Sequence, residues 1–439
     1  MKLSRRKLLA LGASGVALAG CHTRFREVIE SKSPLVHKLA DRKVRLLNRI
    51  AFGASSELSE RLDRLGEAAF IEEQLKAGLP PDPAMLARVA SLDIFTLSTA
   101  ELFDLRMEAV LGQLQQQAIL QAVYNPNQLE ERMVEFWSNH FNIFARVKDS
   151  AFRKPADELR TIRRHALGRF PDLLKASAHS PAMLAFLDNP DSRKGKPNEN
   201  YARELMELHS MGVDGGYSQR DVHEVARCFT GWTIENRFMR PRGQFRFDPE
   251  RHDDGKKVVL GHEIPAGGGK SDGERVLRIL GSHPSTAAYI TRKLCRAFLG
   301  SEDANSVAIV AAVYQKTGGD IREMLRTMFQ LPGFWTGPPI VKRPFDFAVS
   351  VLRLLGAATD GGPAIQNRLA DMGQPLYQWP MPDGYPDDTA AWTGSILARW
   401  NFVLAIAEDR IADTRADWSK IPDREQVLGT LLSPEFQWR

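Results

Sequence analysis

Residues 129–144 read LEERMVEFWSNHFNIF and carry a helical pattern of large apolar side chains. The members of this pattern recur at intervals of three and four residues: Met133, Phe136, Trp137, His140, Phe141 and Phe144. Such spacing places them on one face of an α-helix, and a face this apolar is stable only when it is buried. The stretch therefore predicts a helix packed inside a mainly α-helical protein. His140 lies within the stripe, so its imidazole needs a buried hydrogen-bond partner or a metal ion.

Helical patterns continue on both sides of this stretch. Ser218 followed by Asp221 resembles a capping box, and Gly212 stands where a preceding helix would end. Between about 232 and 263 the sequence alternates and contains glycine, which predicts a small β-hairpin or irregular insert. We expect one large, mainly α, multi-helix domain over residues 36–439, with this β insert near its middle.

Residues 373–391 are rich in Pro, Gly, Trp and Asp and carry no helical pattern. This segment is too long for an ordinary connector, so we expect a functional loop or a surface lid. The loop and the residue after it carry four aromatic side chains: Tyr377, Trp379, Tyr385 and Trp392. Such side chains suit either contact with a partner protein or stacking on a carbohydrate.

The first 21 residues carry the pattern of a bacterial export signal. Arg5-Arg6 precedes an uncharged apolar run that ends in LAGC at residues 18–21. The run is too short to span a bilayer as a folded helix. The arginine pair resembles a twin-arginine signal, and LAGC resembles the lipobox of bacterial lipoproteins. We therefore expect a signal peptide over residues 1–20, a lipid on Cys21, and a tether over residues 21–35. An ordinary secretory signal with a chance cysteine is the alternative.

This signal predicts an exported protein anchored to a membrane through Cys21 and facing the periplasm or the cell exterior. The chain of 439 residues has a formal net charge of +5, but its first seven residues hold four of the positive charges. Removing these four leaves a charge of +1. A near-neutral chain gives no support for nucleic-acid binding, so no nucleic-acid partner is expected. Cys228 and Cys295 remain, either paired in an oxidising compartment or packed as small apolar residues.

Residues 198–209 contain a polar stripe beside an apolar one. Asn200, Arg203, Glu204 and Glu207 recur at helical intervals on one face. Arg203 and Glu207 form an ordinary surface pair in one interpretation. In the other, Glu204 and Glu207, one turn apart, share a proton or bind a divalent cation.

Further acid–base candidates follow downstream. Asp221 and Glu224 are one helical turn apart, and His252 lies on a later turn with Asp253. The predicted metal candidates are Glu204, Glu207, Asp221, Glu224 and His252. No His-Glu-x-x-His pattern, EF-hand loop, Gly-x-Ser-x-Gly elbow or nucleotide-binding loop is present, so no particular metal or cofactor is specified. The glycine run at residues 267–269 lacks a flanking strand pattern and is interpreted as a flexible loop.

Several short motifs, taken in order, carry a resemblance to a known family. They are LNRIAFGA (47–54), FWSNHF (136–141), NENYAREL (198–205), DVHEVAR (221–227) with TGW (230–232), HD (252–253), HP (283–284), RKL (292–294), KRP (342–344), MGQP (372–375) and RWNF (399–402). In this combination the chain resembles the family catalogued as domain of unknown function 1800. The resemblance implies a bacterial and frequently exported protein, often encoded beside an exported partner that resembles the sulfatase and phosphatase fold. It implies no particular reaction.

Two functions fit these observations. The first is a cell-envelope hydrolase that acts on a glycan or another polymer, with residues 373–391 as a lid. Its pocket would be lined by seven candidate residues: His140, Asn200, Arg203, Glu204, Asp221, Glu224 and His252. The second is a non-enzymatic envelope lipoprotein that binds or presents an exported partner, with the same polar residues holding helices in register. Unpaired carboxylates in a concave pocket favour the enzyme, and fully paired networks favour the scaffold.

Overall fold

The computed structural model describes residues 41–236, 242–421 and 423–439. The predicted signal peptide over residues 1–20, the lipid site at Cys21 and the tether over residues 21–35 lie outside the described residues. In the described part, helices dominate and the strands form small two-stranded sheets, which confirms the predicted mainly α fold.

The first half of the described chain is helical throughout. Its helices are α4 (Arg42–Ile50), α5 (Ser56–Leu65), α6 (Glu67–Lys76), α7 (Pro83–Ala90), α8 (Thr99–Leu102), α9 (Met107–Tyr124), α10 (Gln128–His140), α11 (Ser150–Asp157), α12 (Phe170–Ala178), α13 (Pro181–Phe186), α14 (Glu199–Glu207) and α15 (Gln219–Cys228). A π-helical turn, η3 (Glu158–Arg163), continues directly from α11. Ser218 and Asp221 form the predicted capping box at the start of α15.

The predicted β insert is confirmed as two antiparallel pairs. β1 (Trp232–Ile234) pairs with β2 (Phe245–Phe247), and β3 (Lys257–Val259) pairs with β4 (His262–Ile264). A third small pair joins β5 (Ala358–Thr359) to β6 (Thr414–Arg415).

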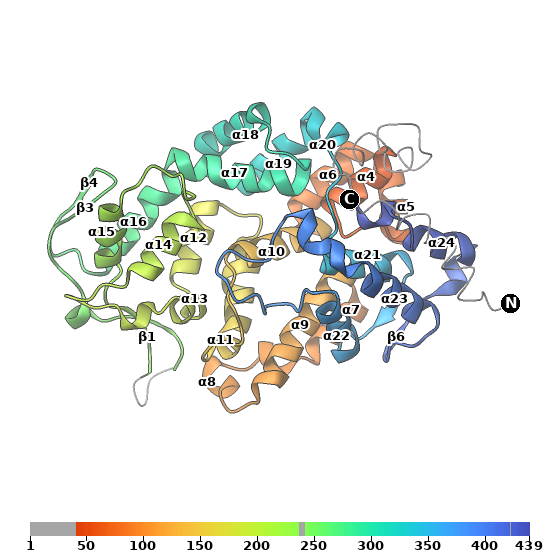
Figure 1. The fold of residues 1–439 in the computed structure, drawn as a ribbon, viewed down its shortest axis with the longest axis horizontal. Coiled ribbons are helices and arrows are strands. Elements are labelled where there is room, and N and C mark those ends of the chain that lie inside the picture. The colour runs from red at the N-terminus through yellow and green to blue at the C-terminus, as the bar shows by residue number, and fades with distance from the viewer. Residues whose placement is uncertain (1–40, 237–241, 422) are drawn as a thin grey trace.

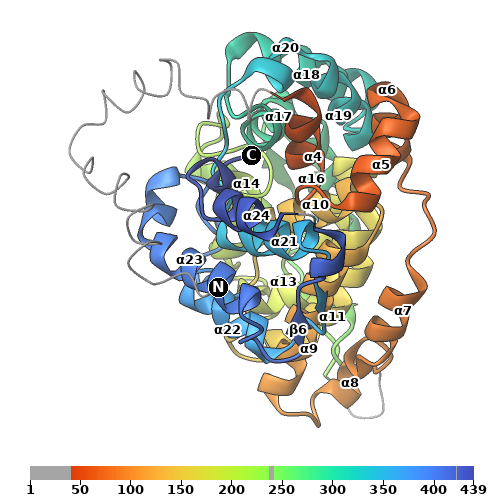
Figure 2. The same ribbon diagram turned by 90° about the vertical axis from the view of Figure 1, so that its right-hand side faces the viewer.

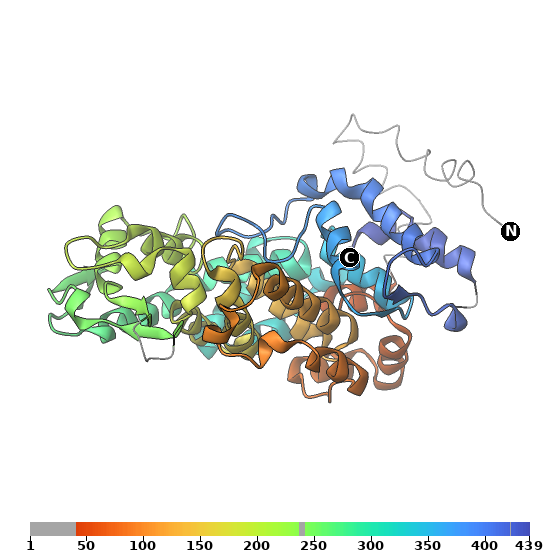
Figure 3. The ribbon, with the colours of Figure 1, turned by 90° about the horizontal axis from the view of Figure 1, so that it is seen from below.

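The remaining helices complete the molecule. They are α16 (Lys270–Ser282), α17 (Pro284–Leu299), α18 (Ala304–Thr317), α19 (Ile321–Gln330), α20 (Pro332–Thr336), α21 (Pro344–Leu354), α22 (Pro363–Asp371), α23 (Ile396–Ala407) and α24 (Arg424–Leu431). Short 3₁₀ turns lie between them and earlier helices: η2 (Asp93–Phe95), η4 (Asn189–Asp191), η5 (Pro249–Arg251), η6 (Thr389–Ser395), η7 (Trp418–Lys420) and η8 (Glu435–Gln437). Figures 1 and 3 show an elongated molecule with α14, α15 and the β insert at one end, and Figure 2 looks onto α21–α24 at the other.

Helix α10 lies between these two ends (Figure 1), and its apolar side chains belong to the larger apolar cluster. Met133 and Trp137 are fully buried in the larger apolar cluster, as the helical spacing predicts. The second large cluster gathers side chains of α9, α21, α22 and α23. Among the described helices, none combines the length and apolar character needed to cross a bilayer.

The predicted helix over residues 129–144 ends earlier than its apolar pattern suggests. Phe141 leaves the helical conformation, with φ −99° and ψ 51°. Beyond it the chain is tied to a distant loop, because Asn142 Nδ2 donates to the carbonyl oxygens of Trp379 (3.0 Å) and Met381 (2.6 Å). These tertiary hydrogen bonds replace the last helical turn, and Phe144 is only partly buried.

Candidate functional site

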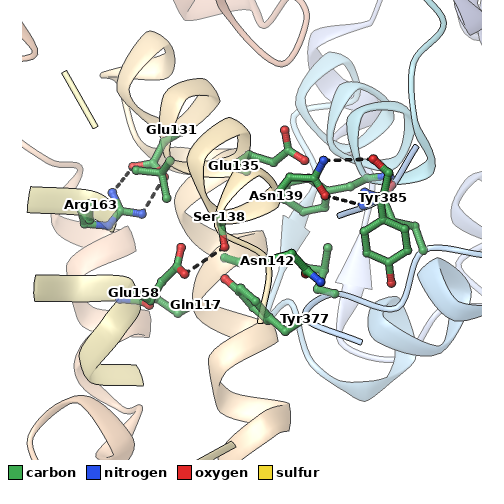
Figure 4. A pocket seen from close by; sticks show the side chains of 16 residues that line it. Gln117, Glu131, Glu135, Ser138, Asn139, Asn142, Glu158, Arg163, Tyr377 and Tyr385 are labelled. Carbon is green, nitrogen blue, oxygen red and sulfur yellow. Dashed lines mark hydrogen bonds and ion pairs between the residues drawn. The ribbon is translucent and has the colours of Figure 1, made fainter. Parts of the chain in front are cut away.

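Residues 373–391, named the strap from here on, pass directly against the end of α10. The Asn139 side chain holds the strap at two points: its Oδ1 accepts from Tyr385 N (2.7 Å) and its Nδ2 donates to Tyr385 O (3.0 Å). Figure 4 shows this pair of hydrogen bonds. Gly384 makes the close approach feasible, because it has φ +81° and a Cβ at this position would overlap the Asn139 carbonyl oxygen.

His140, the next residue on α10, is 1% exposed. Its Nε2 lies 3.2 Å from the carbonyl oxygen of His209. A carbonyl only accepts, so Nε2 carries the ring proton and Nδ1 is left as an acceptor. Burial, followed by the positive charge of Lys293, holds the pKa of His140 well below its ordinary value. The imidazole is therefore neutral near pH 7.

Lys293 on α17 supplies the donor for that free ring nitrogen. Its Nζ lies 3.0 Å from His140 Nδ1. Burial lowers the pKa of Lys293 to about 8, although the negative charges of Asp387 and Asp383 on the strap oppose the shift. An amine with such a pKa exchanges readily between its charged and neutral forms at neutral to mildly alkaline pH.

Glu204 on α14 belongs to the same neighbourhood. Burial raises the pKa of its carboxyl, and the negative charges of Glu207 and Asp383 raise it further. Within the described residues, nothing hydrogen-bonds to the Glu204 carboxylate. Asp383 thus acts electrostatically on both Glu204 and Lys293, which places α14, α17 and the strap around one region. We call His140, Lys293 and Glu204 the strap site.

Tyr289 connects the strap site to the end of α14. Its hydroxyl donates to the carbonyl oxygen of Leu208 (3.2 Å), and its ring centroid lies 6.4 Å from that of His140. The structure thus brings together His140 and Glu204 from the seven sequence candidates. Sequence reasoning did not choose Lys293 as a site residue, although it quoted the RKL motif (292–294) that contains it.

The other candidates lie elsewhere, which corrects the expectation of one shared pocket. Asp221 accepts from Leu260 N (2.8 Å) in addition to capping α15. Glu224 accepts from Val258 N (3.1 Å) and from Arg227 (3.0 Å). These contacts fasten α15 to β3 and the turn after it, and they satisfy both carboxylates.

His252 is also satisfied locally. Its Nδ1 lies 2.8 Å from the carbonyl oxygen of Thr230, and its Nε2 lies 3.3 Å from Asp272 Oδ2. Lys257 Nζ reaches the same Asp272 oxygen at 2.6 Å. We call this group of charged and polar side chains the hairpin cluster; its members are Asp221, Glu224, Arg227, Asp253, His252, Lys257 and Asp272.

Asn200 and Arg203 lie on the outer face of α14. Asn200 is exposed, and its backbone N–H donates to the Asn198 side chain (2.9 Å). Arg203 pairs with Glu207 (3.4 Å) and donates to Gln219 (2.8 Å). The face is the ordinary amphipathic surface that was the alternative interpretation of this stripe.

The metal candidates are divided between the two regions. Across the described ranges, no three His, Cys, Asp or Glu side chains are placed to share a metal ion. Glu204 and Glu207 remain near each other on α14, whereas Asp221, Glu224 and His252 belong to the hairpin cluster. Cys228 and Cys295 are both buried free thiols rather than a disulfide.

A small cavity lies on another side of α10, between α9, η3 and the strap (Figure 4). Its volume is about 60 Å³, and its polar lining includes Gln117, Ser138, Glu158 and Tyr377. None of the seven sequence candidates lines this cavity. Sequence reasoning missed it because its walls come from segments as far apart in the chain as Gln117 and Tyr385. Of its lining, Tyr377 and Tyr385 had been singled out, both for their aromatic rings.

These features define a mainly helical protein with a buried lysine–histidine pair under a tied surface strap. The model of the family described as "Protein of unknown function (DUF1800)" matches residues 45–437. The chain therefore belongs to this family, as its sequence motifs predict. No curated protein and no solved structure matches the chain.

Proposed function

We propose that this protein is an exported hydrolase that cleaves a polymer of the cell envelope at the strap site. The observation that carries the proposal is the 3.0 Å hydrogen bond between Lys293 Nζ and His140 Nδ1. Both groups are shifted toward their neutral forms, and the pKa of the Glu204 carboxyl, which feels the same Asp383 charge as Lys293, is raised. Groups with pKa values displaced in this way are typical of acid–base catalysis.

In this proposal the neutral amine of Lys293 is the general base. One N–H of Nζ donates to His140 Nδ1, and the nitrogen lone pair is free to take a proton from water. The water oxygen attacks the carbon atom of the carbon–oxygen bond that is cleaved, and this bond breaks as the new one forms. The Glu204 carboxyl donates its proton to the departing oxygen, and exchange with solvent restores both groups. His140 is a positioning residue, because it orients Nζ without touching the substrate.

The place of action follows from the N-terminal motifs. Arg5-Arg6 and LAGC at residues 18–21 support export and lipid attachment at Cys21. Polymers of the envelope, glycans above all, are the substrates that an anchored hydrolase would meet there. Replacing Cys21 with Ser is expected to prevent acylation, which incorporation of a labelled fatty acid into the full chain would measure.

The alternative is a non-enzymatic lipoprotein that presents an exported partner, such as one of the sulfatase- and phosphatase-like family. The hairpin cluster favours it, because every carboxylate there has a partner. The aromatic residues of the strap region favour it less. Tyr385 and Trp392 are 7% and 4% exposed and pack inside the protein, so they do not offer a contact surface.

The test compares three variants of the full-length chain on isolated envelope glycan. Lys293→Met and Glu204→Gln should abolish the release of soluble reducing ends. Glu207→Gln is the matched control, because Glu207 lies one turn along the same helix and already pairs with Arg203. Equal release by all three variants, or none by the unaltered protein on any envelope polymer, would overturn the proposal in favour of the partner-binding role.

A further inference from the structure

The cavity beside α10 is separate from the strap site. Ser138 lines it, and His140 is two residues further along the same helix. Two residues correspond to about 200° around a helix axis, so the two side chains leave α10 on opposite sides. The remaining lining comes from α9, η3, the start of α21 and the strap, as Figure 4 shows.

Buried polar groups around this cavity lack partners. Gln117 is 4% exposed, and no described residue hydrogen-bonds to its side-chain amide. Gln374 is 2% exposed; its Oε1 accepts from Phe345 N (2.8 Å), but its Nε2 has no partner in the described chain. The Tyr377 hydroxyl is likewise unpaired there. These polar atoms face the cavity rather than being sealed inside the protein, so a ligand or water in the cavity can pair with them.

Tyr377 lines the cavity with its backbone in a strained conformation. Tyr377 has φ +61°, a conformation that side-chain-bearing residues rarely adopt. Its carbonyl oxygen accepts from Ala145 N (2.9 Å), which holds the residue in place. Figure 4 shows its ring reaching toward Ser138 and Glu158. A strained residue whose unpaired hydroxyl faces a cavity is typical of a binding site rather than of simple core packing.

The charged groups in the cavity wall are balanced. Glu131 accepts from Arg163 (2.8 Å), and Glu135 accepts from Arg343 (2.6 Å). Glu158 accepts from Ser138 (3.1 Å) and from Lys154 (3.0 Å). A charged ligand would lose its hydration here without gaining a free counter-charge, so the wall favours a neutral one.

The size of the cavity and the chemistry of its wall narrow the class of possible ligands further. The cavity volume of about 60 Å³ is several times the space that one water molecule needs, so it has room for a short arm of a few non-hydrogen atoms. It is partly open to solvent, which leaves room outside for the rest of the ligand. Apolar side chains share the wall with the two glutamines: Ala118, Ala122, Val134, Phe345 and Leu376.

We propose that this cavity binds the acetamido arm of an N-acetylated sugar. The arm presents one carbonyl acceptor, one N–H donor and one methyl group. The amides of Gln117 and Gln374 and the hydroxyl of Tyr377 supply the complementary donors and acceptors, and the apolar wall receives the methyl group. This inference goes beyond the proposed function, because binding here does not depend on any reaction at Lys293.

The test measures the binding of free sugars to the full chain by saturation-transfer NMR. N-acetylglucosamine should bind saturably, glucose should bind at least about tenfold more weakly, and glucosamine should not bind. Gln117→Leu and Tyr377→Phe should each weaken N-acetylglucosamine binding about tenfold or more. Tyr124→Phe is the control, because the Tyr124 hydroxyl already donates to Ala357 O (2.8 Å) away from the cavity.

Thermal unfolding of each variant establishes that it is folded. If Gln117→Leu fails to fold, Tyr377→Phe still tests the site, because it removes only one oxygen atom. Lys293→Met should bind N-acetylglucosamine normally, so a failed hydrolysis assay would not count against this site. Equal binding of glucose and N-acetylglucosamine, undiminished binding by both cavity variants, or no binding because the cavity holds only water would each overturn the proposal.

Discussion

The hairpin cluster and the strap site contain the same kinds of residue but differ in the partners that their charged side chains have. In the hairpin cluster Asp272 meets both Lys257 and His252, so its charge is matched by partners. In the strap site the hydrogen bond of Lys293 goes to a neutral imidazole, and Glu204 has no hydrogen-bond partner within the described chain. The comparison teaches that titratable residue types do not distinguish a structural network from a reactive one; their partners do.

The largest expected effect comes from removing the reactive amine. Lys293→Met should lower hydrolysis of the envelope polymer by about 10²–10⁴-fold, the range for loss of a general base. Its stability should change little, because the variant replaces a buried, poorly paired amine with an apolar chain of similar length. Arg227→Met in the hairpin cluster is the contrasting variant: it should reduce stability and leave the activity of the folded fraction unchanged. Steady-state rates and urea unfolding measure the two effects, and the reverse pattern would refute the assignment.

The second effect concerns stability alone. Asp272→Asn leaves the Lys257 ammonium, which is 1% exposed, without its ionic partner. Loss of one member of a buried pair should reduce the free energy of unfolding by about 3–5 kcal/mol. Glu263→Gln is the control, since the Lys256–Glu263 pair is exposed and contributes little. If both variants unfold at the same urea concentration, the hairpin cluster is not the structural network described above.

A smaller effect should follow from loosening the strap. Gly384→Ala places a Cβ against the Asn139 carbonyl at φ +81°, so we expect a loss of about 1–3 kcal/mol and a partial loss of activity. Gly394→Ala should be neutral, because no atom lies near the added methyl group. Hydrogen exchange of the strap amides measures the loosening. Unchanged exchange in Gly384→Ala would show that Asn139 does not hold the strap.

The smallest effect is a pH dependence of stability. The folded-state pKa of Lys293 is about 8, below the ordinary value of about 10.4 for an unfolded chain. Between these values the unfolded state binds more protons, so the contribution of Lys293 to stability rises with pH across about pH 8 to 10.4. Below pH 8 the full penalty of burying the ammonium is present. The unaltered protein should therefore gain stability relative to Lys293→Met over this range. Parallel unfolding curves would contradict the lowered pKa.

Prediction from the sequence succeeded where neighbours along the chain carry the information. The apolar stripe of α10, the Ser218–Asp221 capping box and the β insert each depend on residues a few positions apart. The candidate site was harder. His140 and Glu204 were chosen for their chemistry and do lie near each other, but Asp221, Glu224 and His252 were chosen for the same reason and serve the hairpin cluster.

The sequence by itself determined the helical class, the family, and the capped start of α15, because periodicity and capping are local properties. Tertiary structure alone decided which polar groups found hydrogen-bond or ion-pair partners and which did not. Lys293 and His140 are 153 positions apart, and Asn139 meets Tyr385 across 246 positions. No local pattern encodes such meetings, since burial and pairing depend on how distant segments pack, and it is burial that lowers the pKa of Lys293 and raises that of Glu204.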